Sequence, residues 1–223
     1  MIEFKDVAYG YGDSDLLTGV SLSLAPGSFY FLTGPSGSGK TTFLKLCYRE
    51  LLASSGRVTI LGEDAASLQR DGVAALRQRI GVVHQDCQFL DHLSVADNVA
   101  LPLSVAHKRG HAGELEELLA WVGLSNQINA LPPELSGGER QRVALARAVI
   151  MSPDVVIADE PTGNVDWEMS LRLLSLLVEL NRMGKTILIA THDLNLIRAA
   201  KAQVSARVLR ISNRRLQTAG ADL

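Results

Sequence analysis

The chain contains no hydrophobic run long enough to cross a membrane. Its longest apolar stretches, such as residues 155–158 and 187–190, fall far short of the ~20 residues that a membrane-spanning helix needs. The N-terminus also lacks the basic segment followed by an apolar segment that marks a secretory signal. We therefore expect neither a membrane-spanning helix nor a signal peptide.

Cysteine is scarce, and neither sign of charge is in large excess. The two cysteines, Cys47 and Cys87, lie far apart without a CxxC spacing or a histidine cluster beside them, which favours reduced thiols of a cytosolic protein over a disulfide or a zinc site. The 22 basic and 24 acidic residues give a net charge of -2, so no bulk attraction to nucleic acid is expected.

Hydrophobic residues are abundant, at 47% of the 223 positions. This content suits one domain with buried parallel strands, and it also suits a surface that partners cover; composition does not separate the two causes. We expect a single domain over residues 1–223, with a helical subdomain at about residues 86–154.

Short apolar strands alternate with helical patterns along the chain, which predicts an α/β fold with a parallel-sheet core. The expected strands of this alternation are residues 29–33, 57–61, 80–83, 155–158 and 186–190, and the expected helices are 42–52, 138–150, 168–181 and 193–200. The alternating segments 2–7 and 20–24 predict a small antiparallel sheet, the stretch 93–130 predicts inserted helices, and 207–216 predicts a terminal hairpin.

A glycine-rich loop follows the first apolar core strand. Residues 34–41 match the pattern G-x-x-x-x-G-K-[ST], with a strand before the loop and a helix after it. Glycine lets backbone N–H groups converge on phosphate oxygens, and the helix N-terminus adds partial positive charge. The residues that we expect to contact a nucleotide are Gly34, Pro35, Ser36, Gly37, Ser38, Gly39, Lys40, Thr41 and Thr42. Lys40 is expected on the β and γ phosphates, Thr41 on Mg²⁺ and Thr42 near the α phosphate.

Two carboxylates end the apolar strand at residues 155–158. Alone, Asp159 and Glu160 could be no more than solvated acids at a strand end. Beside a phosphate loop, we expect Asp159 to hold Mg²⁺ and Glu160 to act as the general base on the attacking water.

Gln85 and His192 each follow an apolar strand, at the end where parallel sheets bind ligands. Gln85 is expected to contact Mg²⁺ and the attacking water, and His192 the γ phosphate. A single histidine in a loop is more often a surface residue, and the position of His192 relative to the other motifs is what favours the catalytic role.

The heptapeptide Leu-Ser-Gly-Gly-Glu-Arg-Gln at residues 135–141 precedes the strand that ends in Asp159. Together with the phosphate loop, Gln85, residues 163–166 and residues 191–193, it resembles the motif series of the ATP-binding-cassette (ABC) ATPases over nearly the whole chain. The resemblance implies a RecA-like core and a head-to-tail homodimer that encloses two ATP molecules. Ser136, Gly137 and Gly138 would then contact ATP bound to the other copy, and Asp166 would couple the two sites.

The resemblance also implies that an aromatic ring stacks on adenine. Tyr11 is the expected residue, with Tyr9 as the alternative. No N-K-x-D stretch that would select guanine is present, so ATP with Mg²⁺ is the expected ligand.

Residues 161–166 and 97–103 resemble the cell-division branch of this family, although His84 and Val165 depart from its pattern. That resemblance implies peripheral attachment to the cytoplasmic face of the bacterial inner membrane, an integral membrane partner of the FtsX type, and control of septal cell-wall hydrolysis. Two alternatives stay open: a subunit of a lipoprotein-release, macrolide-export or amino-acid transporter, and an ABC ATPase that acts on DNA or ribosomes.

Overall fold

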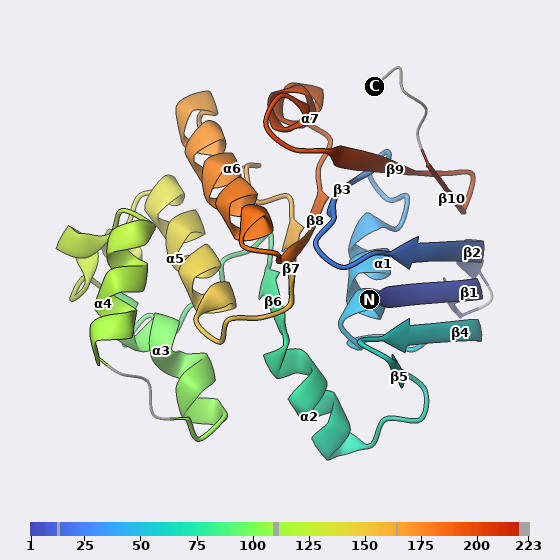
Figure 1. The fold of residues 1–223 in the computed structure, drawn as a ribbon, viewed down its shortest axis with the longest axis horizontal. Coiled ribbons are helices and arrows are strands. Elements are labelled where there is room, and N and C mark those ends of the chain that lie inside the picture. Colours follow the sequence, from blue (N-terminus) through green and yellow to red (C-terminus); the bar gives the residue numbers. More distant parts are fainter. Residues whose placement is uncertain (13, 109–111, 164, 219–223) are drawn as a thin grey trace.

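Two sheets and a set of helices make up the computed structural model, which describes residues 1–12, 14–108, 112–163 and 165–218 (Figure 1). The larger, six-stranded sheet has the order β10-β9-β3-β8-β7-β6. Its strands are β3 (Phe29–Thr33), β6 (Ile80–Val83), β7 (Val155–Asp159), β8 (Thr186–Ala190), β9 (Ala206–Ser212) and β10 (Arg215–Thr218). All neighbours are parallel except β9 and β10, which form the expected terminal hairpin.

The centre of this sheet is apolar on both faces because it lies between two cores. Every residue of β3, β7 and β8 is buried, and successive residues face opposite sides. Tyr30 and Leu32 pack in one core, whereas Phe29 and Phe31 pack in the other.

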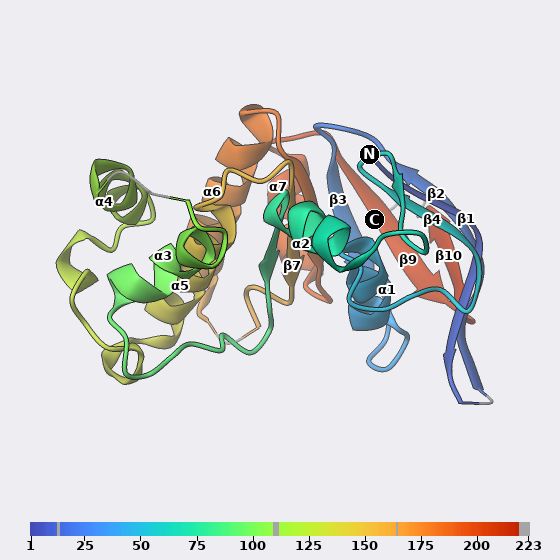
Figure 2. The same ribbon diagram turned by 90° about the horizontal axis from the view of Figure 1, so that it is seen from below.

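The first core is closed by helix α1 (Lys40–Cys47) and by the four-stranded antiparallel sheet β2-β1-β4-β5. Its strands are β1 (Ile2–Tyr11), β2 (Ser14–Leu24), β4 (Ser55–Ile60) and β5 (Glu63–Asp64). Figure 2 shows this sheet stacked beside the β9–β10 end of the larger one. The Thr18 N–H donates to the Arg214 carbonyl at 2.8 Å, which joins the two sheets.

Helices α5 (Gly137–Val149), α6 (Trp167–Arg182) and α7 (Leu194–Lys201) cover the second core. On the outer side of α5, helices α3 (Val95–Val105) and α4 (Ala112–Trp121) and the short 3₁₀ turns η1 (Ser125–Gln127) and η2 (Pro132–Glu134) enclose a third core. This is the expected helical insertion. Within the described ranges, no helix combines the length and the apolar character that crossing a membrane requires.

The bounds of β6 and β8 match the sequence prediction, and α5 and α6 match within about one residue. The prediction was wrong at the end of α1, which stops at Cys47 rather than residue 52 because Arg49 adopts a left-handed backbone with φ of 60°. The prediction also missed helix α2 (Arg70–Gln78). Its segment contains several charged residues, and Leu76 is its one fully buried residue, so the sequence shows little helical periodicity of apolar residues.

Strand β6 packs closely on α5 at Gly81, which suggests a stability test. A Cβ at Gly81 would collide with the Ala148 carbonyl, a backbone atom that cannot turn away. We expect Gly81→Ala to lower the free energy of unfolding by about 1–3 kcal/mol, measured by urea titration.

The matched control for this test is Gly113→Ala in α4, where an added Cβ meets no atom within 4 Å. We expect the control to be neutral or stabilising by up to about 1 kcal/mol, since alanine favours helix. Equal effects of the two substitutions would contradict the packing account.

Candidate functional site

A cavity of about 620 Å³ lies at the carboxyl edge of the parallel strands. Backbone hydrogen bonds hold this edge in register beyond the strand ends: Thr191 N–H donates to Leu32 O at 3.0 Å, and Glu160 N–H to Ala190 O at 2.9 Å. Most of the predicted site residues line this cavity: Gly34, Pro35, Ser36, Gly37, Gly39, Lys40, Thr41, Thr42, Gln85, Asp159, Glu160 and His192. Ser38 lies in the same loop without lining the cavity.

The loop from β3 to α1 has a backbone shape that depends on glycine. Gly39 precedes α1 with φ of 100°, a region that residues with a Cβ avoid. Lys40 turns back over the loop, and its Nζ donates to Gly34 O at 3.0 Å and to Pro35 O at 3.4 Å. The ammonium group therefore rests on carbonyl oxygens beside the N-terminus of α1, where an anionic phosphate would be a stronger partner.

Thr41 and Asp159 both line the cavity and are hydrogen-bonded to each other. The Thr41 hydroxyl donates to Asp159 Oδ2 at 2.7 Å, and Asp159 is only 8% exposed. Burial raises the pKa of the Asp159 carboxyl, and the nearby Glu160 adds to the rise, while the Thr41 hydrogen bond and Lys40 act against it. A hydroxyl and a carboxylate side by side are oxygen donors of the kind that Mg²⁺ binds, and a cation there would favour the ionised carboxylate.

Glu160 adopts a left-handed backbone, with φ of 46°. Its Oε1 lies 3.9 Å from Lys40 Nζ, and both carboxylate oxygens lie 3.1 Å from Nδ1 of His192. The Glu160 side chain is 12% exposed and that of His192 is 75% exposed. The Glu160 carboxylate thus lies between the half-buried ammonium group of Lys40 and the accessible imidazole of His192, where it can accept a proton from a water molecule.

Gln85 follows β6 and lines the cavity, and α5 fixes the segment after it. Arg147 donates to the Gln88 carbonyl at 2.7 Å and stacks 4.7 Å above the Phe89 ring, while Arg140 donates to the Cys87 carbonyl at 3.3 Å. The sequence analysis missed this connection, because two arginines on a helix give no sign of which carbonyls they bind.

The predicted residues of the heptapeptide do not line the cavity. Ser136 caps the N-terminus of α5, where its hydroxyl accepts from Glu139 N–H at 3.3 Å and Glu139 Oε2 accepts from Ser136 N–H at 2.8 Å. Gly137 and Gly138 form the first turn of that helix. Asp166 caps α6 in the same way and accepts from Met169 N–H at 2.8 Å. Asn164, in the same motif as Asp166, lies outside the described residues.

Tyr11, the predicted adenine-stacking residue, does not line the cavity. Tyr11 is 57% exposed at the end of β1, and its ring packs edge-on against Tyr9 at 5.1 Å. Leu16 of β2 lines the cavity instead, beside Gly39. An isolated leucine in an alternating strand gave no signal for this position.

The fold and this cavity define a P-loop nucleotide-binding protein, and comparison with known proteins identifies its family. Residues 17–163 match the model of the ABC transporter family. The chain is 44% identical over 201 residues to the cell division ATP-binding protein FtsE of Haemophilus influenzae, covering 88% of this chain and 92% of the relative. It is 43% identical over 216 residues to the FtsE of Escherichia coli, covering 96% of each chain.

A solved structure of an ATP-binding cassette also resembles this chain. The dimeric post-hydrolysis state of the ATP-binding cassette MJ0796 bound to ADP and Pi superposes with a TM-score of 0.86 at 30% identity, over 98% of each chain. The chain belongs to the ABC transporter family, and it is an ATPase of the kind that this family contains.

The raised pKa of Asp159 predicts that this site costs stability when it holds no ligand. Because the folded pKa lies above the unfolded one, the penalty grows as the pH rises through the folded pKa and vanishes below the unfolded pKa, about 3.9. We expect Asp159→Asn to raise the midpoint of thermal unfolding of the nucleotide-free protein at pH 7, and the gain to disappear near pH 4.

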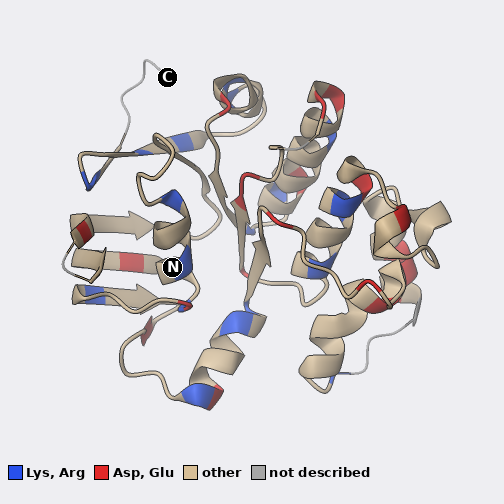
Figure 3. Cartoon of the chain, turned by 180° about the vertical axis from the view of Figure 1, so that it is seen from behind, with Lys and Arg blue, Asp and Glu red and all other residues tan. Residues whose placement is uncertain are grey.

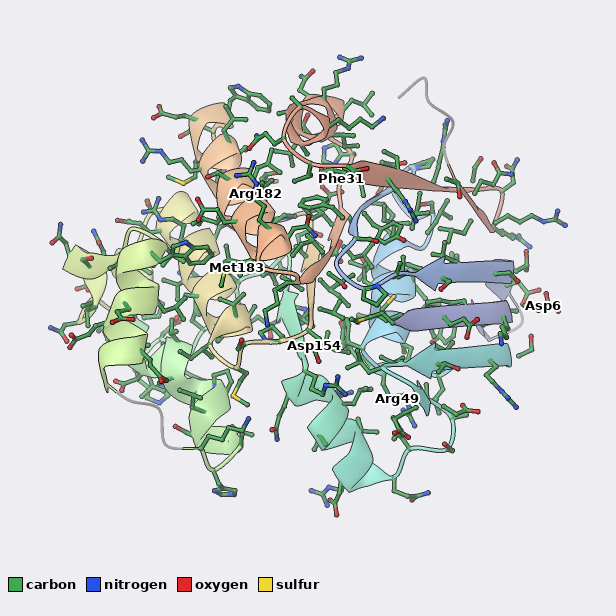
Figure 4. All side chains as sticks on the ribbon, in the orientation of Figure 1. Asp6, Phe31, Arg49, Asp154, Arg182 and Met183 are labelled. Carbon is green, nitrogen blue, oxygen red and sulfur yellow. The ribbon has the colours of Figure 1, made fainter. Side chains whose placement is uncertain are left out.

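Asp154 provides the control for this prediction, because it lies just before the other end of β7 (Figure 4). It pairs with Arg79 at 2.7 Å on the surface, so Asp154→Asn should leave the midpoint unchanged or slightly lower. A midpoint for Asp159→Asn below that of the unaltered chain at pH 7 would contradict the burial penalty.

Proposed function

We propose that this chain is the ATPase subunit of an FtsE-like membrane complex in cell division. Two copies close on ATP and move an integral membrane partner of the FtsX type, which controls septal cell-wall hydrolysis. The observation that carries the proposal is the convergence of Lys40, the Thr41–Asp159 pair and the Glu160–His192 pair on one cavity. The identities of 39–44% to several FtsE proteins support the cell-division role.

Within the site, each proposed role follows from the placement of the side chain. Bound Mg²⁺ would neutralise charge on the β and γ phosphates. Thr41 and Asp159 would hold that ion, and Gln85 would contact it. Lys40 leaves the carbonyls of Gly34 and Pro35 for the phosphates. The loop N–H groups at the start of α1 bind the phosphate oxygens, and Tyr11 remains the candidate for the adenine ring.

Glu160 is proposed as the general base, and His192 orients it. The carboxylate is held by the imidazole at 3.1 Å and by the strained backbone of residue 160. Such strain persists only where surrounding contacts enforce it, here the hydrogen bonds from Glu160 N–H to Ala190 O and from Gly163 N–H to Glu160 O. The side chain is thus positioned before a substrate arrives.

A second copy is proposed to complete the site. The start of α5, where Ser136 and Gly137 are exposed and Gly138 is half-buried, offers the backbone N–H donors of Gly137 and Gly138 and does not line the cavity of its own copy. Helix N-termini favour anions, so these donors suit the γ phosphate of ATP held by another copy, with Asp166 at the junction. Two solved structures of the similar cassette MJ0796 are described as dimeric.

The partner-binding surface is proposed at a second cavity, of about 750 Å³, between α2, β6, α3 and α5. Gln85 links the two cavities along the chain, because His84 lines the second and Gln85 the first. Through this contact the chain would be a peripheral subunit at the cytoplasmic face of the inner membrane.

Replacing the proposed base tests its role. Glu160→Gln removes proton acceptance and keeps the shape of the side chain, so ATP should still bind while turnover falls by about 10²–10⁴-fold. The variant should accumulate as an ATP-bound dimer, measured by size-exclusion chromatography. Glu168→Gln is the control, because Glu168 forms only an exposed pair with Arg172. Near-normal turnover of Glu160→Gln would remove Glu160 from the reaction.

Mixing two inactive variants tests whether copies share sites. Lys40→Ala disables the phosphate loop of a copy, and Ser136→Arg blocks the start of its α5. A mixed dimer has one doubly altered site and one intact site, so part of the ATPase activity should return. Mixed dimers that form and stay inactive would show that the site lies within one copy.

Co-purification from membranes tests the biological role. We expect an FtsX-type membrane protein to be retained by Glu160→Gln in the presence of ATP. Retention of a lipoprotein-release permease instead would contradict the cell-division assignment.

A further inference from the structure

The first turns of α5 and α6 pack against each other through the side chain of Met169. Gly138 of α5 has no side chain, and a Cβ at that position would lie 2.9 Å from Met169 Cγ and 3.0 Å from Met169 Cε. Figures 1 and 2 both show the two helices side by side. The methionine of α6 therefore fills the space that the glycine of α5 leaves free.

Hydrogen bonds tie Met169 to Asp166, the residue that caps α6. The Met169 N–H donates to Asp166 Oδ1 at 2.8 Å, and the Ser170 hydroxyl donates to the Asp166 carbonyl at 2.9 Å. On α5, Ser136 is the capping residue and lies two positions before Gly138. The caps of the two helices are thus connected through the contact between Met169 and Gly138.

Arg142, one turn further along α5, contacts the sulfur atom of Met169. Its Nη1 donates to Met169 Sδ at 3.1 Å. Among the residues that the structure describes, Arg142 Nε has no hydrogen-bond partner and the guanidinium forms no ion pair with a carboxylate. Figure 3 shows basic positions along α5, and the other two arginines of this helix, Arg140 and Arg147, donate to backbone carbonyls instead. Because a thioether is a weak acceptor, the Arg142 contact orients the methionine more than it stabilises the arginine.

We propose that Met169 is a positioning residue for the site that two copies share. Its side chain fixes the spacing between the start of α5, with Ser136, and the start of α6, with Asp166. Both caps then meet the second copy in one arrangement, and closing the dimer does not have to order them separately, which would cost free energy. The proposal rests on the proposed function, because it assumes that a second copy completes the site.

Ordinary core packing is the competing explanation for Met169. The side chain is half-buried and packs at the edge of the second core. A role in packing alone predicts that removing the side chain lowers the midpoint of thermal unfolding and leaves the association of folded copies unchanged. A positioning role predicts that association is lost while other packing defects in the same helix spare it.

The test uses Met169→Ala, with Leu180→Ala as the matched control, both in the Glu160→Gln chain with ATP. Leu180 is 7% exposed and lies near the other end of α6. We expect Met169→Ala to raise the protein concentration at which half of the chains are dimeric at least about fivefold, and Leu180→Ala less than about twofold. Neither side chain lines the cavity, so ATP affinity measured far below the dimer concentration should stay the same in both.

Met169→Leu gives a second comparison, because leucine fills a similar volume without the sulfur atom. We expect this variant to associate within about twofold of the Glu160→Gln chain, since the filled space sets the spacing. The proposal would be overturned by unchanged association of Met169→Ala, by an equal loss in Leu180→Ala, or by a Met169→Leu chain as weak as Met169→Ala. A Glu160→Gln chain that forms no dimer with ATP would overturn the shared site of the proposed function, and the role of Met169 with it.

Discussion

The register of three parallel strands is the constraint on which the rest of the molecule depends. Leu32 of β3 pairs with Ala190 of β8, and Ala190 pairs with Asp159 of β7. These pairings end all three strands at one edge, so the phosphate loop, the two carboxylates and His192 emerge together. A shift of one residue in any strand would turn its functional side chain toward a core instead. The two apolar cores that enclose the sheet therefore fix the site as well as the fold.

Several features of the site lower the stability of the fold, and the packing of the two cores offsets that loss of stability. Asp159 is an acid held in a buried position, Glu160 has a strained backbone, and Lys40 lies against carbonyl oxygens. Magnesium and phosphate, if bound as proposed, would supply the opposite charges for Asp159 and Lys40, whereas the strain at Glu160 is a property of its backbone. Protein sites commonly trade stability for function in this way, because their side chains are arranged for the bound state.

Local sequence patterns predicted the parts of the site that depend on local geometry. The glycine spacing around Lys40 and the acids after an apolar strand indicate where these side chains lie, because loop shape and strand ends are set by neighbouring residues. Leu16 and the Arg147–Gln88 contact could not be predicted in this way. Both depend on how elements far apart in the chain pack, and helix α2 was missed because its apolar face is narrow.

The unit of function in this account is larger than one chain. The first turn of α5 does not line the cavity of its own copy, and the groove beside α3 is lined by Arg77 and Arg147. One feature calls for a second copy and the other for a different protein. A single physical principle links them, since fixed charges and helix dipoles that the free subunit does not neutralise stabilise a complex more than the free subunit.

Disulfide crosslinking between copies tests the central claim most directly. One copy carries Ser36→Cys on the phosphate loop, and a differently tagged copy carries Ser136→Cys at the start of α5. With ATP bound, the account predicts a disulfide between the two copies, and little without nucleotide. No crosslink with ATP, in dimers that demonstrably form, would contradict a site shared between copies.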